Sequence, residues 1–332
     1  MRVEVIKLFK DGPILLHIGL RRMDRTSNII HSDTLFSALS DVLIKLLGEK
    51  RFDIFEKKIL LSSVFPGLRG TSRDILFLPM PEIPLKLEES AELEHKKYKK
   101  IQWVSLEAFK ELIKGFDREN MVMEFISPEK FKFLNSRILV TVPEFAEIGE
   151  EINFMDTLLE PKVSLSRDSQ EPNLYFQENL ELYPIKTSLN KELVPFLYFL
   201  KAKDDELNSI FIPVLNLFIE EGIGGERTTG KGIFDSYQTE EMDIPDRGDF
   251  EVTLSLTFPK REEVDNLIYY QLVKRDGFIY YQKPTGLRKK THFKIREGAL
   301  VKSPYLGENI DVSPRRDMRV ISYGKSLGFK FS

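Results

Sequence analysis

The sequence predicts a globular α+β protein, because two kinds of hydrophobic periodicity occur along it. Several short segments alternate apolar and polar residues as strands do, and two longer segments repeat their apolar residues at helical spacing. Apolar residues make up 42% of the 332 residues and charged residues 30%, which is the balance of a globular chain long enough for two domains.

The sequence has no apolar run of about 18 residues and no signal-peptide pattern, so we expect a cytoplasmic protein without a membrane contact. The absence of cysteine excludes disulfides, zinc–thiolate sites and thiol catalysis.

Strand patterns open the chain and are followed by a helix. Residues 2–9 and 13–19 alternate as two strands or as one interrupted strand. Residues 32–47 predict an amphipathic helix, for which Ser32 or Asp33 can provide the N-cap. Its apolar stripe consists of Leu35, Leu39, Val42 and Leu46.

The middle of the chain combines further strands with a long insertion. Strand patterns occur at residues 58–65, 74–81, 137–142, 161–168 and 193–202. Residues 82–135 are charged and only partly helical, so we interpret them as an insertion. The polar segment 166–173 between two strand patterns is typical of a loop.

A second amphipathic helix is predicted over residues 204–222. Its apolar residues are Leu207, Ile210, Phe211, Val214, Leu215, Phe218 and Ile219. We expect Asp204 or Asp205 to cap it and Gly222 to end it. A strand pattern follows at residues 233–238.

The resulting order is strand, helix, strand, strand, helix, strand, which is the order of ferredoxin-like domains and of RNA-recognition modules. We therefore predict two ferredoxin-like (RRM-like) domains, the first at residues 1–243 with long insertions and a glycine-rich loop. The second, at residues 244–332, is smaller and degenerate, with one predicted helix at residues 262–275.

The glycine-rich loop reads EEGIGGERTTGKGIFD over residues 220–235 and nearly matches a phosphate-binding P-loop. In a P-loop a strand precedes the glycines and a helix follows, whereas here the predicted helix comes first. Gly232 also stands where a Mg²⁺-binding hydroxyl is required, so we exclude nucleotide hydrolysis.

We predict instead that this loop lines a sugar-phosphate backbone, with Arg227 and Lys231 as charge contacts, because glycines allow close approach to another chain. The glycines concerned are Gly222, Gly224, Gly225, Gly230 and Gly232. A flexible connector between helix and strand is the alternative. Gly224 and Gly225 are expected to tolerate alanine without loss of stability, since the end of the helix does not require them.

Three basic segments lie elsewhere, at residues 21–25, 95–100 and 288–296. Such segments bind nucleic acid when they share one face of the protein, and otherwise they are ordinary solvated surface. The four histidines show no metal-ligand spacing, so no metal site is predicted.

Several stretches together resemble one protein family. They are HSDTLFSAL at residues 31–39, SVFPGL followed by FLPMP, KKYKKIQWVS, KVSLSRDSQEPNLYFQ, GIGGERTTGKG, and the tail EGALVKSPYLGENIDVSP…YGKSLGF. The glycine-rich loop alone resembles the RAMP superfamily of CRISPR systems. The combination resembles the fourth Csm subunit of type III-A effector complexes over nearly the full chain.

That resemblance implies a non-catalytic, cofactor-free subunit that binds RNA in antiviral defence. Members of the family cap the 5′ end of the crRNA by gripping its repeat-derived handle. They also join the large polymerase-like Cas subunit to the third Csm subunit, which forms the backbone filament. In the family a thumb element inserts near the junction of handle and guide, and residues 164–176 occupy its place here.

Further candidate contacts follow from the resemblance. Arg167 is expected to meet a phosphate or stack on a base, with Asp168 orienting it, although a solvent-exposed turn is the alternative. His31 and Ser32 are candidate handle contacts. Related RAMP nucleases use a histidine near this helix, so a metal-independent crRNA-processing endoribonuclease is the alternative function. Such a reaction needs a second group and a cation, which the sequence does not nominate, and a capping or packing role for His31 is the simpler interpretation.

Overall fold

The computed structural model describes residues 1–20, 22–86, 97–124, 127–165, 172–281 and 283–332. It combines one large sheet, several small ones and a set of helices, which confirms the predicted α+β class. The ferredoxin-like assignment of the two parts and their boundary at residue 243 stay predictions. Within the described residues, no helix has the length and apolar character needed to cross a membrane.

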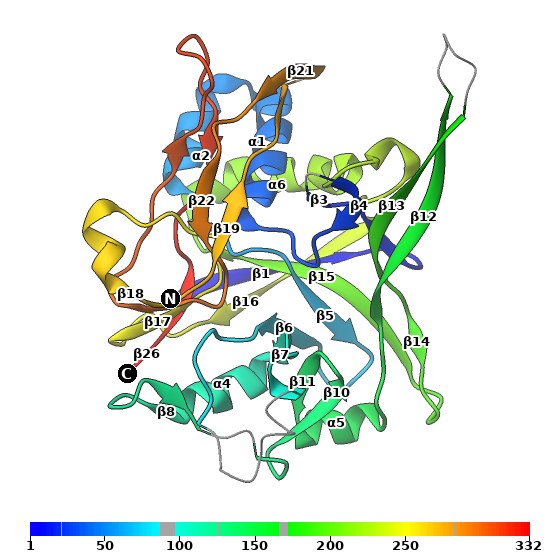
Figure 1. The fold of residues 1–332 in the computed structure, drawn as a ribbon, viewed down its shortest axis with the longest axis vertical. Coiled ribbons are helices and arrows are strands. Elements are labelled where there is room, and N and C mark those ends of the chain that lie inside the picture. The colour runs from blue at the N-terminus through cyan, green and yellow to red at the C-terminus, as the bar shows by residue number, and fades with distance from the viewer. Residues whose placement is uncertain (21, 87–96, 125–126, 166–171, 282) are drawn as a thin grey trace.

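A nine-stranded sheet forms the centre of the described chain (Figure 1). Its strands are β1 (Arg2–Phe9), β5 (Phe65–Arg69), β6 (Ile75–Pro79), β7 (Trp103–Ser105), β10 (Phe131–Asn135), β11 (Ile138–Thr141), β14 (Ile185–Lys186), β15 (Glu192–Ala202) and β16 (Ser236–Asp243). They follow the order β10-β11-β7-β6-β5-β15-β1-β16, with β14 paired to β15. Val5 of β1 lies opposite Leu200 of β15 and Glu240 of β16, and both pairings are antiparallel.

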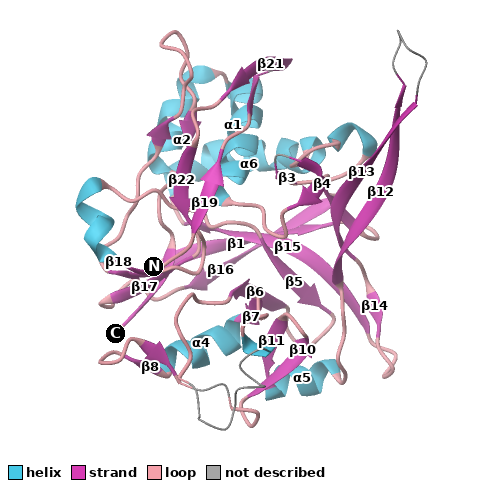
Figure 2. Cartoon of the chain, viewed as in Figure 1, coloured by secondary structure: helices cyan, strands magenta, loops and turns pink. Residues whose placement is uncertain are grey.

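Helices cover this sheet in two groups (Figure 2). The α-helices of the described residues are α1 (Ser32–Leu47), α2 (Phe52–Lys58), α4 (Leu106–Lys114), α5 (Val142–Ile148) and α6 (Asp205–Glu221). Short 3₁₀ segments are η1 (Glu49–Arg51), η2 (Arg227–Thr229) and η3 (Arg261–Asn266). Helices α1, α2 and α6 lie together on one side, whereas α4 and α5 lie beside the strands of the insertion.

The helices predicted at residues 32–47 and 204–222 are present as α1 and α6, but their N-termini differ. Asp204 caps α6 as predicted, because its carboxylate accepts the Leu207 N–H at 2.9 Å. In α1 the N-cap position is His31 and makes no side-chain cap bond, so the expected capping by Ser32 or Asp33 is wrong. Both side chains point instead to partners in the last third of the chain.

A long hairpin projects from the body of the molecule beside smaller strands (Figure 1). It consists of β12 (Met155–Leu165) and β13 (Pro172–Leu182), and β13 also pairs with β2 (Ile14–Leu16). Two further small ribbons are β3 (Gly19–Leu20) with β4 (Arg22–Thr26), and β8 (Phe116–Asp117) with β9 (Val122–Met123).

The last third of the chain is built from strands. A four-stranded sheet contains β17 (Phe250–Thr253), β18 (Leu267–Tyr269), β23 (Leu300–Lys302) and β26 (Gly328–Phe331). Ribbons are formed by β19 (Leu272–Arg275) with β22 (His292–Ile295), β20 (Phe278–Tyr281) with β21 (Lys283–Arg288), and β24 (Ile310–Asp311) with β25 (Ile321–Ser322).

The helix predicted at residues 262–275 is wrong. Only η3 is helical there, and the chain then extends into β18 and β19. The segment from Leu267 to Val273 is rich in β-branched and aromatic residues, which favour strands where a partner strand is available. Strands β23 and β22 supply those partners from later in the chain.

One continuous hydrophobic core joins the early and late parts of the chain. Phe36 of α1 stacks on Tyr323 with their ring centroids 5.2 Å apart. Phe109 of α4 meets Phe329 of β26 edge-on at 5.3 Å. The last third of the chain is therefore packed directly on α1 and α4.

Candidate nucleic-acid interface

The glycine-rich loop, residues 222–232, connects α6 to β16 and has a closed base. The Ile223 N–H donates to the Gly232 carbonyl at 2.9 Å. Gly222 and Gly232 both have positive φ angles, of 72° and 67°. A Cβ atom on Gly222 would collide with Gly232, and one on Gly232 would collide with the Ile223 carbonyl. These two glycines are required by the loop itself, because its two ends approach each other too closely for side chains.

The next two glycines pack against the start of the chain. The Gly225 N–H donates to the His17 carbonyl at 2.8 Å, and the two residues form an antiparallel bridge. Gly224 has a φ of +92°, and a Cβ atom there would lie 2.8 Å from the same carbonyl oxygen. The expectation that Gly224 tolerates alanine without loss of stability is therefore wrong, because the backbone angle and the close contact both favour glycine.

The apex of the loop is its exposed part and comprises Arg227–Gly230. Thr228 and Thr229 are exposed in the single turn of η2. Gly230 has no heavy atom within 4 Å of its Cβ position. The Arg227 side chain is 28% exposed and lies 3.8 Å from a carboxylate oxygen of Glu221. The apex thus offers a partly exposed guanidinium and an open glycine to an approaching backbone.

Lys231 has a different environment, since only 5% of it is exposed. Its Nζ atom lies 2.7 Å from Glu160 of β12 and 3.1 Å from Glu226, and it donates to the Asn179 side chain of β13 at 3.0 Å. A lysine has three N–H donors, and three acceptors occupy them here. Lys231, which the sequence predicts as a phosphate contact, therefore ties the loop to the base of the hairpin.

A second lysine, Lys162, contacts the same two carboxylates as Lys231. Lys162 lies 3.1 Å from Glu226 and 3.6 Å from Glu160. The hydrogen bond from Lys231 lowers the pKa of Glu160. Burial raises the pKa of Glu226, but hydrogen bonds from Lys162 and Lys231 outweigh it and lower that pKa below its ordinary value. Both carboxylates are thus ionised at neutral pH and hold the two lysines.

The projecting hairpin carries apolar side chains on one exposed face. They are Leu159, Val163, Leu174 and Phe176, which are 53%, 58%, 58% and 47% exposed. Val163 lies opposite Leu174 in the antiparallel register, so both point to the same face. The predicted thumb at 164–176 falls at the end of this hairpin, whereas Arg167 and Asp168 lie outside the described residues.

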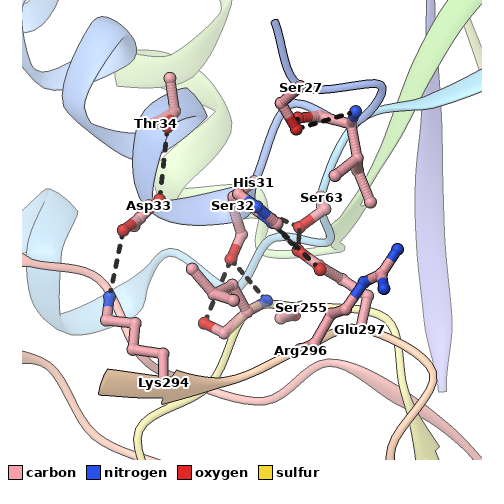
Figure 3. A network of polar contacts seen from close by, with 12 residues as sticks. Ser27, His31, Ser32, Asp33, Thr34, Ser63, Ser255, Lys294, Arg296 and Glu297 are labelled. Atoms are coloured by element: carbon pink, nitrogen blue, oxygen red, sulfur yellow. Dashed lines mark hydrogen bonds and ion pairs between the residues drawn. The ribbon is translucent and has the colours of Figure 1, made fainter. Parts of the chain in front are cut away.

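His31 and Ser32 are buried, at 4% and 0% exposure. The His31 Nδ1 atom lies 2.9 Å from a carboxylate oxygen of Glu297, which also accepts the Ser63 hydroxyl (Figure 3). The Leu256 N–H donates to the Ser32 hydroxyl at 3.0 Å. These two candidate handle contacts are therefore bonded inside the protein, where they join α1 to the last third of the chain.

Asp33, next in sequence, belongs to the same buried junction. Burial raises its pKa, but Arg275 and Lys294 outweigh this and hold the pKa far below its usual range. The Arg275 guanidinium donates to both carboxylate oxygens, at 2.8 and 2.9 Å. Burial lowers the pKa of Lys294 to about 8. The sequence stretch HSD thus marks an internal junction in this structure.

A polar cleft of about 960 Å³ is a feature that the sequence did not indicate. It lies between the proline-rich segment 79–85, residues 98–102 and the base of β22. Four cations line it, namely Lys99, Lys100, Arg137 and Arg296. The basic segment at residues 95–100 supplies two of them, but Arg137 and Arg296 arrive through tertiary folding. The described residues, including those of this cleft, contain no group of three His, Asp or Glu placed to hold a metal ion.

Comparisons with known proteins agree with the motifs. Residues 246–331 match the family model of the CRISPR Csm4 C-terminal domain. The chain is 28% identical over 335 residues to the Csm4 protein of Methanocaldococcus jannaschii, covering 91% of this chain and 86% of the relative. It is 27% identical over 284 residues to the Csm4 protein of Thermococcus onnurineus, covering 83% of each.

Two solved structures share the fold. A chain of the Csm3–Csm4 subcomplex of a type III-A CRISPR-Cas interference complex matches with a TM-score of 0.67 and 24% identity, covering 100% of both chains. A chain of the Csm1–Csm4 cassette in complex with cA4 matches with a TM-score of 0.57 and 20% identity, covering 100% of this chain and 98% of the other.

Proposed function

Because this chain resembles Csm4 proteins over 91% of its length, as its motifs predict, we propose that it is the RNA-binding cap subunit of a type III-A Csm effector complex. It grips the 5′ handle of the crRNA and acts in antiviral defence in the cytoplasm. It bridges a large polymerase-like subunit and the third Csm subunit. The solved Csm3–Csm4 and Csm1–Csm4 assemblies of similar fold support these two partners.

We infer the RNA contact from a difference between two parts of the glycine-rich loop. The polar groups at its base are bonded inside the protein, whereas its apex is exposed. Lys231 is held by its three internal partners, so we assign it to loop structure. Arg227 is the charge contact of this proposal, and Gly230 gives a sugar-phosphate backbone room to approach. The projecting hairpin is joined to this loop through Glu160 and serves as the thumb.

The scaffold of the proposed site is a ferredoxin-like core. Strand β1 lies between β15 and β16, and β5 lies on the far side of β15, with antiparallel pairing throughout. Helix α1 follows β1, and α6 connects β15 to β16 through the glycine-rich loop. This order supports the ferredoxin-like interpretation of residues 1–243.

The subunit is non-catalytic in this proposal, and the burial of His31 supports that assignment. Its Nδ1 atom faces Glu297, and the residue is only 4% exposed, so the ring is not presented to an RNA 2′-hydroxyl. Incubation of the pure protein with repeat RNA in the absence of metal should leave the RNA intact. Discrete cleavage that His31→Ala abolishes would instead establish the endoribonuclease alternative.

The handle contact is tested by the salt dependence of binding. We expect the full chain to bind a fluorescent RNA that contains the repeat-derived handle more tightly than a scrambled RNA. Arg227→Ala should weaken that binding and reduce the log–log salt slope by about 0.7, the value for one phosphate contact on single-stranded RNA. Lys114→Ala on α4 removes an equally charged, exposed side chain and serves as the control. An unchanged slope for Arg227→Ala would show that the apex does not contact phosphate.

A further inference from the structure

A second basic surface lies in the last third of the chain. Residues 270–296 contain eight lysines and arginines and one aspartate, whereas the whole chain has a net charge of −3. The same segment contains five aromatic residues. It forms strands β19 to β22, and Figure 1 shows these strands beside α1 and α2, away from the projecting hairpin.

The two faces of the β19–β22 ribbon have different roles. On the inner face, Arg275 bonds to Asp33, and the fully buried Lys294 donates to the Ser322 hydroxyl at 2.8 Å. These two cations anchor the ribbon to α1 and β25. These contacts explain how the ribbon is attached, but they do not explain the residues exposed on its outer face.

The outer ribbon face alternates aromatic or apolar side chains with cations. It comprises the exposed residues Leu272, Lys274 and Phe293 of the β19–β22 pair, and the exposed residues Phe278, Arg288 and Lys290 of the adjoining β20–β21 pair and its connection to β22. Lys274 lies opposite Phe293, and Phe278 lies opposite Arg288. Phe278 and Phe293 are 62% and 52% exposed, and the Arg288 guanidinium lies 4.7 Å from the Phe278 ring centroid.

One cation of this face has a carboxylate nearby: hydrogen bonds from Ser313 lower the pKa of Asp311, and the charge of Lys290 lowers it further. Within the described residues, no ion pair joins an acidic side chain to Lys274, Arg288 or Lys290. This contrasts with Lys162 and Lys231 near the glycine-rich loop, each of which contacts two carboxylates. An apolar protein partner would bury Lys274 and Arg288 without an ion-pair partner, at a cost of several kcal/mol per ion.

We propose that the outer ribbon face binds a single-stranded RNA segment without sequence preference. Exposed aromatic rings stack on bases, and interleaved cations contact the phosphates between them, which is the chemistry of single-strand binding surfaces. A single-stranded RNA has both phosphates and aromatic bases, so it can contact the cations and the aromatic rings of this surface at the same time. The surface is distinct from the apex of the glycine-rich loop, and the proposal stands independently of handle binding.

The test measures binding of a fluorescein-labelled, mixed-sequence 20-nucleotide RNA to the full chain in the presence of excess unlabelled handle RNA. Phe278→Ala with Phe293→Ala should weaken binding at least about fivefold, because one lost base stack accounts for that much. Lys274→Ala, Arg288→Ala and Lys290→Ala together should reduce the log–log salt slope by about 2. Binding of a duplex RNA of equal length should be insensitive to the two phenylalanine substitutions.

Two matched controls make the result specific. Ile212→Ala with Leu306→Ala removes exposed apolar side chains elsewhere. Lys50→Ala, Arg51→Ala and Lys57→Ala remove three exposed cations near α2. Both controls should bind the RNA as wild type does, and far-UV circular dichroism verifies the fold of every variant.

Wild-type affinity in both ribbon variants would overturn the proposal, as would equal losses in the charge control. Retained RNA binding with lost co-purification of a Csm1-type or Csm3-type subunit would also overturn it and identify a protein interface.

Discussion

Arg227 and Lys231 lie four positions apart in one loop, but their side chains have different surroundings. Arg227 is 28% exposed at the apex and lies beside Glu221, whereas Lys231 fills a buried space between Glu160, Glu226 and Asn179. Removal of a cation from such a space leaves carboxylates without their main partner, and this destabilises the fold. We therefore propose a structural role for Lys231 and a binding role for Arg227.

We predict that Lys231→Met lowers the free energy of unfolding by about 2–3 kcal/mol, since charged hydrogen bonds are lost and the carboxylates lose compensation. Arg227→Ala should change it by less than about 0.5 kcal/mol, as is usual for substitutions near the surface. Urea denaturation of both variants provides the comparison. Equal stability of Lys231→Met and wild type would show that the tie between loop and hairpin is not needed for folding.

Glu251 of β17 predicts a pH dependence of stability. It is 1% exposed, and burial raises its pKa from 4.5 to about 7, although the Ser326 hydroxyl donates to it at 2.7 Å. Between these two pH values the folded chain binds a proton that the unfolded chain has lost. Its contribution to stability is therefore present at low pH and is lost as the pH rises through about 7.

We predict that Glu251→Gln is more stable than wild type above pH 7, by up to about 3 kcal/mol. Below about pH 4.5 the two proteins should differ little, because both then have an uncharged side chain at this position. Melting temperatures measured between pH 4 and pH 9 test the sign. A stability difference that grows toward acid pH would contradict this account of Glu251.

At the scale of the element, the glycine-rich loop depends on where each glycine lies. Gly224 and Gly230 have similar φ angles of +92° and +89°, so alanine costs conformational energy at both. Only at Gly224 would the new Cβ atom also approach the His17 carbonyl, at 2.8 Å.

We therefore predict that Gly224→Ala destabilises the protein more than Gly230→Ala does, by at least about 1 kcal/mol. Gly230→Ala is the matched control, since it has the same backbone strain and open space around the Cβ position. Thermal unfolding of the two variants decides the matter. The reverse order of stability would mean that the loop does not rest on the His17 strand as described.

Sequence patterns correctly predicted the elements that depend on contacts between residues close together in sequence. The 3.6-residue period located α1 and α6, and the Asp204 cap was identified because its partner is only three residues away. The helix expected at residues 262–275 failed because long-range strand partners override helical spacing in a segment of β-forming residues.

The candidate site was predictable in position but not in detail. The glycines marked the loop, whereas two of the three acceptors of Lys231 lie 71 and 52 residues away in sequence. Likewise, His31 meets Glu297 at a separation of 266 residues. No local pattern indicates such partners, so a buried lysine and a buried histidine both resembled exposed contacts.

At the scale of the whole molecule, the early and late parts of the chain depend on each other. Asp33 of α1 is buried against Arg275 and Lys294, and Tyr323 stacks on Phe36. The Ser63 N–H donates to the Leu254 carbonyl at 2.8 Å across the same junction.

We predict that Arg275→Ala lowers the free energy of unfolding by about 3–5 kcal/mol, because Asp33 then loses its main partner inside the protein. Arg275→Lys should restore only part of the loss, since a lysine cannot donate to both carboxylate oxygens in a planar fork. Arg275→Ala combined with Asp33→Asn should recover more stability than Arg275→Lys. Chemical denaturation measures all three, and a neutral Arg275→Ala would contradict the described junction.

The proposed contact joins the apex of the glycine-rich loop to the 5′ handle of a crRNA. It is tested most directly by photo-cross-linking in the reconstituted complex, with 4-thiouridine placed in the handle and the cross-linked peptides identified by mass spectrometry. We expect cross-links on the loop peptide that contains Arg227–Gly230, and fewer of them when the photoreactive base is moved to the 3′ end of the guide. Handle cross-links confined to other subunits, or to parts of this chain away from the loop and the projecting hairpin, would contradict it.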